Sequence, residues 1–449
     1  MTPIDPETWL REHRIDEIEC MVPDLTGMPR GKILPRDRFL RSIADGSLRM
    51  PADVFYQTVT GEYPDPFPGD LTSPDMILHP DPQTLRLVPW YTDPTAQVMC
   101  NVTWRDGTPV STAPREVLRR VIGLYEEKGW TPVVAPELEF YLVAKNLDPD
   151  LALEPPKGRS GRTESGRQAY GIDAANEFDH VVDDIYDFCE AARVDLDTLI
   201  HEAGPAQLEV NFNHGDPLEL ADMVVVFKRV CREAAMRHDI YCTFMAKPIE
   251  GEAGSAMHIH QSVVNTKNGQ NIFADARGND TRAFRHYIAG LQHYLPSAMP
   301  LFAPNVNSYR RLRADSDAPI NTHWGYENRT VGFRVPESDR RGRRVENRVP
   351  GVDVNPYLAM AGTLACGYLG MIEKLDPSKP MQGNAYKARG HGLPRHLPDA
   401  LLRLARCKEL QDVLGEDFVD LAVAVKQAEH DEYQDVISPW EREHLLLNV

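Results

Sequence analysis

Two strand-like stretches carry paired side chains that could bind a cation. In Met257-His-Ile-His260, residues i and i+2 point to the same face of a strand, so the two imidazoles would share one face. Glu137 and Glu139 in Pro136-Glu-Leu-Glu-Phe140 would converge in the same way, and adjacent carboxylates raise each other's pKa unless a cation lies between them. The simpler alternatives are a pair of core histidines and a solvated edge strand. A His-x-His pair could also bind zinc, as in a barrel hydrolase.

Further acidic residues follow later in the chain. Glu202 and Glu209 are seven residues apart, which would put them on opposite faces of one straight strand, but Gly204-Pro205 breaks that strand and lets both reach one site. Glu346 and Arg348 share a face of a third strand. Carboxylates that outnumber imidazoles favour Mg²⁺ or Mn²⁺ over Zn²⁺.

Arginine is concentrated in residues 307–350, which hold ten arginines and no lysine. Arginine offers a planar fork that matches carboxylate and phosphate groups. Metal ions together with guanidinium groups neutralise the charge that develops in phosphoryl transfer. The chain has no Gly-x-x-x-x-Gly-Lys-Ser/Thr motif and no kinase motif set, so a nucleotide would be bound by another architecture.

The composition excludes several classes of protein. A chain of 449 residues with a net charge of −18 is not typical of a nucleic-acid-binding protein, which would carry a basic face. The seven cysteines are scattered and form no Cys-x-x-Cys pair, which indicates reduced thiols in a cytoplasm. No secretory signal is evident, and the longest uncharged run, residues 355–372, is expected to be a buried helix rather than a membrane span.

The pattern of elements changes near residue 107. A predicted hairpin over 16–36, a surface loop over 51–73 and short apolar runs up to Trp104 indicate a small β-rich domain, residues 1–107. From Thr112, a candidate helix cap, helices and strands alternate, which indicates a catalytic α/β or α+β domain over 108–449. The further predictions are a strand over 133–143, a loop over 146–169, and helices over 179–200, over 217–239 and from about 397 onward.

In this order, these motifs resemble those of the glutamine synthetase family, along nearly the whole chain. The matching stretches are Pro136-Glu-Leu-Glu-Phe-Tyr141, Gln207-Leu-Glu-Val210, Lys247-Pro248 with Gly254-Ser-Ala-Met-His-Ile-His-Gln-Ser262, Asn307-Ser-Tyr-Arg-Arg-Leu312, Asn328-Arg-Thr-Val-Gly-Phe-Arg-Val-Pro336, Arg344-Val-Glu-Asn-Arg-Val-Pro350 with Asn355-Pro-Tyr-Leu-Ala359, and Val436-Ile-Ser-Pro-Trp-Glu-Arg-Glu443. The resemblance implies an α+β fold, with an N-terminal β-grasp domain and a catalytic domain built on a funnel-shaped antiparallel sheet. It also implies a double-ring homo-oligomer, a dodecamer, with active sites between subunits.

The resemblance also implies a role for each matching residue. Two or three Mg²⁺ or Mn²⁺ ions would be held, the first by Glu139, Glu202 and Glu209, and the second by Glu137, His258 and Glu346. Glutamate would be held by Gly254, Arg311 and Arg348, transferred phosphate by Arg329 and Arg334, and ATP by His260, Ser262 and Arg344. The reaction would transfer phosphate from ATP to the γ-carboxylate of glutamate, after which an amine would displace that phosphate.

The departures from the family pattern bear on the amine. Ammonia-using members carry a Phe-Asp-Gly-Ser-Ser motif that is missing here, and a shorter acid, Asp317, stands where they have a flap glutamate. Three further stretches look like γ-glutamylpolyamine and γ-glutamylputrescine synthetases, namely Gln57-Thr-Val-Thr-Gly-Glu62, Arg30-Gly-Lys32 and Asn305-Val-Asn-Ser-Tyr-Arg-Arg311. These comparisons predict Glu202 and Asp317 as catalytic carboxylates, Tyr170 as a wall of the amine pocket, and Asp53 and Glu62 as candidates for a distal ammonium group.

Three functions remain open at this point. A glutamate–amine ligase acting on putrescine or another polyamine is favoured, an ammonia-using glutamine synthetase is the nearest alternative, and a catalytically silent structural member is the third. A complete set of six metal-ligand positions argues against a catalytically silent protein. Neither a membrane nor a nucleic acid is expected as a partner.

Overall fold

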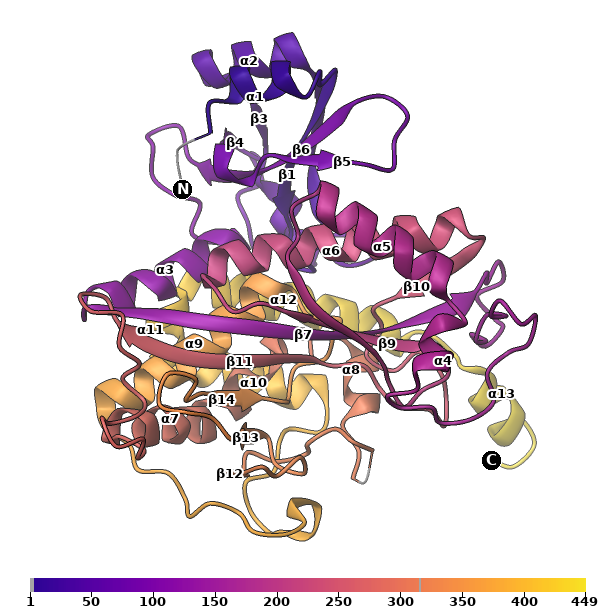
Figure 1. Cartoon of the computed structure of the whole chain (residues 1–449), viewed down its shortest axis with the longest axis vertical. Coiled ribbons are helices and arrows are strands. Elements are labelled where there is room, and N and C mark those ends of the chain that lie inside the picture. Colours follow the sequence, from indigo (N-terminus) through magenta and orange to yellow (C-terminus); the bar gives the residue numbers. More distant parts are fainter. Residues whose placement is uncertain (1–3, 315) are drawn as a thin grey trace.

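The computed structural model describes residues 4–314 and 316–449, and two β-sheets organise them (Figure 1). The N-terminal sheet has six strands in the order β2-β1-β6-β4-β3, with β5 also paired to β6. Strands β1 and β6 run parallel, and the other pairs are antiparallel. The strands are β1 Glu17–Pro23, β2 Pro29–Pro35, β3 Arg49–Pro51, β4 Asp75–Pro80, β5 Arg86–Val88 and β6 Thr95–Thr103. Helices α1 (Pro6–Glu12) and α2 (Arg36–Asp45), which the sequence analysis did not predict, lie beside this sheet.

The second sheet has eight strands in the order β12-β13-β14-β11-β7-β9-β8, with β10 paired to β7. Its pairs are antiparallel except for β12 with β13. The strands are β7 Trp130–Ala144, β8 Leu196–His201, β9 Gln207–Phe212, β10 Ile240–Thr243, β11 Met257–Asn265, β12 Trp324–Tyr326, β13 Phe333–Val335 and β14 Val345–Asn347. The mixture of a largely antiparallel sheet with separate helices confirms the predicted α+β class.

The long strand β7 crosses the middle of the second sheet (Figure 1). Residues such as Val134, Leu138 and Phe140 point into the core, because successive side chains of a strand alternate between faces. The opposite face presents Glu137 and Glu139, as the sequence predicted.

Helices surround the second sheet, and one of them, α9, lies at the centre of the core. They are α3 Pro114–Glu126, α4 Ile172–Asn176, α5 Asp179–Ala191, α6 Pro217–Arg237, α7 Arg282–Ala298, α8 Val306–Arg311, α9 Pro356–Glu373, α10 Leu397–Arg406, α11 Lys408–Leu414, α12 Glu416–Gln434 and α13 Pro439–Leu445. Every residue of α9 from Pro356 to Met371 is buried, which confirms the buried helix expected there. A β-carbon at Gly290 of α7 would lie 2.1 Å from the Cys366 carbonyl oxygen of α9, so these two helices pack without room for a side chain. No helix among the described residues is both long and apolar enough to span a membrane.

Buried polar contacts join the N-terminal sheet to helices of the second part of the chain. The Asn355 side chain, which caps α9, also donates to the Asp24 carbonyl in the β1–β2 turn at 2.8 Å. Arg115 of α3 forms a buried ion pair with Asp222 of α6 at 2.8 Å and reaches Asp81, which follows β4, at 2.9 Å. These bonds fix the N-terminal sheet against the helices of the catalytic part. The division at residues 107 and 108 itself stays a prediction.

Two sequence predictions of local structure are wrong. The helix predicted over 179–200 ends at Ala191, because Arg193 adopts a left-handed conformation (φ 53°) and residues 196–201 pair with β9 instead. The cap of α3 is Ala113 rather than Thr112, and no side chain caps that helix. The C-terminal region is helical as expected, although breaks at Cys407, at Gly415 and over 435–438 divide it into four helices.

Candidate active site

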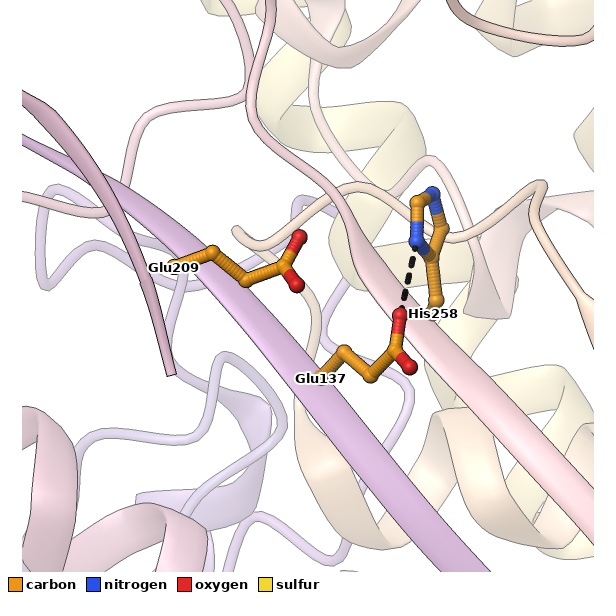
Figure 2. Close-up of side chains that lie close together, drawn as sticks. All are labelled: Glu137, Glu209 and His258. Carbon is orange, nitrogen blue, oxygen red and sulfur yellow. Dashed lines mark hydrogen bonds and ion pairs between the residues drawn. The ribbon is translucent and has the colours of Figure 1, made fainter. Parts of the chain in front are cut away.

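Glu137 lies at the centre of the acidic cluster. Strand register places it directly opposite His258 of β11 and Asn211 of β9. The His258 Nδ1 atom lies 3.4 Å from one Glu137 oxygen, and the His260 Nε2 atom lies 2.7 Å from the other. Figure 2 shows Glu137, Glu209 and His258 converging from three neighbouring strands. Burial alone would raise the pKa of Glu137, but the hydrogen bonds with His258 and His260 outweigh it and hold that pKa well below its usual value.

Two groups of side chains have their ligand atoms within 4.8 Å of one another among the described residues. The groups are Glu137 with Glu209 and His258, and Glu137 with His260 and Glu346. Carboxylate oxygens with one imidazole nitrogen fit a hard divalent cation such as Mg²⁺ or Mn²⁺. Glu209, predicted as a ligand of the first ion, is thus grouped here with Glu137 and His258 of the second predicted set. His260, predicted as a nucleotide contact, is grouped with Glu137 and Glu346.

Glu139, Glu202 and Glu209 form the other half of the cluster. Glu139 is directly opposite Glu209 in the β7–β9 register. Burial, together with the charge of Glu202, raises the pKa of Glu139 to about 8, and burial, Glu139 and Glu137 raise the pKa of Glu209 to about 9. Burial also raises the pKa of Glu202, helped by Asp317. Carboxylates buried together in this way need a cation to be ionised at neutral pH.

Glu346 is fully buried and is held by two guanidinium groups. Arg348 Nη1 donates to one carboxylate oxygen at 2.5 Å, and Arg334 Nη1 donates to the other at 2.9 Å. Burial opposes ionisation, but Arg348, His260 and His258 outweigh it and lower the pKa of Glu346 to about 2. Arg348 directly follows β14, and its contact with Glu346 brings the two side chains together, as the sequence indicated.

Gly254 and Arg311 form a close-packed corner of the site. Arg311, the last residue of α8, donates through its two η nitrogens to the carbonyl oxygens of Val349, at 2.8 Å, and Arg348, at 3.1 Å. Burial lowers the pKa of Arg311 to about 10. A β-carbon at Gly254 would lie 2.6 Å from Arg311 Cγ, so only glycine fits there.

These residues line one cavity of about 490 Å³. The predicted residues in its wall are Glu137, Glu139, Tyr170, Glu202, Glu209, Gly254, His258, Arg311, Asp317, Arg329, Arg334, Glu346 and Arg348. The three predicted nucleotide contacts, His260, Ser262 and Arg344, instead line a second cavity of about 410 Å³. Both cavities share Glu137 and Asn211, so they meet at the acidic cluster.

Some functional positions differ from the expectation or were not predicted. Gln207 was part of a matching motif without a role, yet its amide donates to the Gly254 carbonyl and the Ser255 hydroxyl, both at 3.1 Å, and it lines the cavity. A polar glutamine at the start of an apolar strand was the signal available in the sequence. Asp53 and Glu62 do not line the cavity of this chain, and the loop between them is bonded to α12 through Val59 and Thr60. Their part in amine binding stays a prediction.

Comparisons with known proteins show which family the chain resembles. The family described as glutamine synthetase, catalytic domain, matches residues 111–445. The chain is 36% identical over 439 residues to a gamma-glutamylputrescine synthetase of Escherichia coli K12, covering 96% of this chain and 92% of that protein. It is 32% identical over 443 residues to a glutamate–isopropylamine ligase of a Pseudomonas species, covering 96% of this chain and 95% of that protein. Glutamine synthetases are also among the matches.

A solved structure of GmaS without ligand superimposes with a TM-score of 0.86 at 26% identity, covering 99% of both chains. The chain therefore belongs to the glutamine synthetase family, and it is a ligase of that family. The family generally uses ATP and divalent metal ions and is generally oligomeric.

Proposed function

We propose that this ligase joins the γ-carboxylate of L-glutamate to a polyamine such as putrescine. A carboxylate oxygen of glutamate attacks the γ-phosphorus of ATP, and ADP leaves. The amine nitrogen then attacks the acyl carbon of γ-glutamyl phosphate, phosphate leaves, and the amine proton passes to a carboxylate. The observation that carries this proposal is a cavity whose wall holds both carboxylates and arginines and which meets a second cavity at Glu137.

The acidic cluster would hold the metal ions. Glu139, Glu202 and Glu209 would hold one, and Glu137, His258 and Glu346 would hold another, with His260 close enough to assist. When bound, the ions would offset negative charge on the ATP phosphates. The raised pKa values of Glu139 and Glu209 support this assignment, because a cation is the natural partner of these carboxylates.

The arginines would bind the anionic reactants. Arg311 and Arg348 would hold glutamate beside Gly254, and Arg329 and Arg334 would neutralise charge on the phosphate being transferred. Arg311→Lys tests the first role, because an ammonium group cannot reproduce the bonds to two carbonyl oxygens and a carboxylate. We expect the KM for glutamate to rise far more than that for ATP, and equal KM values in mutant and wild type would remove Arg311 from the glutamate site.

The amine would enter beside Tyr170, where Asp317 and Glu202 also line the cavity. Glu202 is suited to accept the amine proton, since burial and Asp317 raise its pKa. The missing Asp-Gly-Ser-Ser motif and the short Asp317 leave room for a carbon chain and give ammonium less compact charge. Asp53 and Glu62, from this or another subunit, are our candidates for binding a second ammonium group.

Phosphate release with glutamate, ATP and Mg²⁺ across an amine panel tests the function. We expect kcat/KM for putrescine or a longer polyamine to exceed that for ammonium more than about tenfold, or about 1.4 kcal/mol in transition-state binding. Efficient glutamine formation from ammonium, with no phosphate release in the presence of any diamine or polyamine, would establish the ammonia-using alternative. No turnover with any nitrogen donor would indicate a silent member.

The assembly and location of the enzyme belong to the same proposal. We propose a cytoplasmic double ring, in keeping with family members, in which active sites lie between subunits. Light scattering of the purified protein tests the assembly, and a monomeric mass with full activity would contradict it.

A further inference from the structure

One buried histidine connects the acidic cluster to the loop that carries Tyr170. His201, the last residue of β8, has a fully buried side chain and directly precedes Glu202. Its carbonyl oxygen accepts a hydrogen bond from the Tyr170 backbone N–H at 2.8 Å. Its ring lies 3.0 Å from Glu164, six residues before Tyr170. The β7–α4 loop, residues 145–171, is thus attached to His201 at two points.

The second ring nitrogen of His201, Nδ1, contacts the backbone of the next residue, Glu202. His201 Nδ1 lies 2.8 Å from the Glu202 carbonyl oxygen, while Nε2 faces the Glu164 carboxylate. Each ring nitrogen thus lies within hydrogen-bonding distance of an oxygen atom, one of the backbone and one of a carboxylate. His201 therefore links Glu164 and Glu202 through a single ring.

Glu164 also supports the turn that follows Glu202. The carboxylate oxygen that contacts His201 accepts from the Ala206 backbone N–H at 2.8 Å. Ala206 has a φ of 55°, a left-handed conformation that is uncommon for alanine, so this bond stabilises a strained turn. The side chain of Gln207, the next residue, donates a hydrogen bond to the Gly254 carbonyl and so connects the turn to the proposed glutamate site.

We infer that Glu164 and His201 are positioning residues that hold Tyr170 and Glu202 in the wall of the active cavity and so set the affinity for the amine. This inference rests on the proposed function for its substrate. Glu164 is not in the wall of the cavity of about 490 Å³, whereas Tyr170 and Glu202 both are. Its effect on catalysis is therefore exerted through the loop and the turn.

Substitutions at Glu164 separate a positioning role from a general structural one. In Glu164→Ala, we expect the KM for putrescine to rise at least about tenfold while the KM for ATP stays within about twofold. In Glu164→Gln, the amide oxygen can still accept from His201 and Ala206, so the putrescine KM should stay within about threefold of wild type. Glu154→Ala, an exposed glutamate of the same loop, is the matched control and should behave as wild type.

Hydrogen–deuterium exchange tests, independently of activity, whether Glu164 anchors the β7–α4 loop and the turn after Glu202. Glu164→Ala should accelerate exchange in peptides covering residues 157–171 and 201–206, and Glu154→Ala should not. Unchanged exchange in Glu164→Ala, or an equal rise in all KM values with a lowered melting temperature, would overturn the inference. Accelerated exchange in a protein that uses no amine would instead support the anchor and refute the proposed function.

Discussion

Metal binding should release protons from this enzyme, because its buried carboxylates hold protons when no cation is present. With pKa values raised to about 8 for Glu139 and about 9 for Glu209, both carboxyl groups are mainly protonated at pH 7. A metal ligand must be deprotonated, so one ion bound between them should release about two protons. Glu137 and Glu346, whose pKa values are lowered, should contribute almost none.

Calorimetric titration of Mn²⁺ into metal-free protein at pH 7 measures this number, when repeated in two buffers that differ in ionisation enthalpy. The apparent binding enthalpy, plotted against the ionisation enthalpy of the buffer, should have a slope of about two protons per ion. In Glu209→Gln this slope should fall to about one. Between pH 7 and pH 8 the affinity should rise steeply with pH, and above pH 9 it should level off. A slope of zero in the wild type would show that Glu139 and Glu209 are not protonated in the metal-free protein.

The same carboxylates bear on stability. A carboxyl group whose folded-state pKa is raised stabilises the fold below its unfolded pKa, near 4.5, and that contribution is lost as pH rises through the folded value. The metal-free protein should therefore lose stability between about pH 5 and pH 9, and Mn²⁺ should restore it at the alkaline end. Thermal unfolding with and without the ion measures both effects.

Two further substitutions test the framework that supports the site. Asp222→Ala leaves Arg115 buried without its main partner and should lower the free energy of unfolding by about 3–5 kcal/mol in urea titrations, and a loss below about 1 kcal/mol would contradict a structural role for the pair. Gly204→Ala would place a β-carbon 1.8 Å from the Tyr141 hydroxyl oxygen, so it should distort the turn after Glu202 and abolish activity. Gly123→Ala, in an open helical position, is its control and should be neutral or slightly stabilising, and full activity in both variants would show that the turn tolerates displacement.

Local sequence patterns predicted a large part of this site. The period of two along 136–140 and 257–260 correctly put Glu137 with Glu139, and His258 with His260, on shared faces, because side-chain direction in a strand depends only on the alternation of residues. The Gly204-Pro205 break correctly allowed Glu202 and Glu209 to reach one cavity.

Relations between distant strands came only from the tertiary structure. Glu137 faces His258, and Glu139 faces Glu209, because packing of the core sets the register of β7 with β11 and β9, and no local pattern encodes it. The same applies to residues 196–201, whose apolar spacing suited a helix until pairing with β9 made them a strand. The contact between Glu164 and His201 joins residues 37 positions apart across an irregular loop, so its existence depended on where the folded sheet placed that loop.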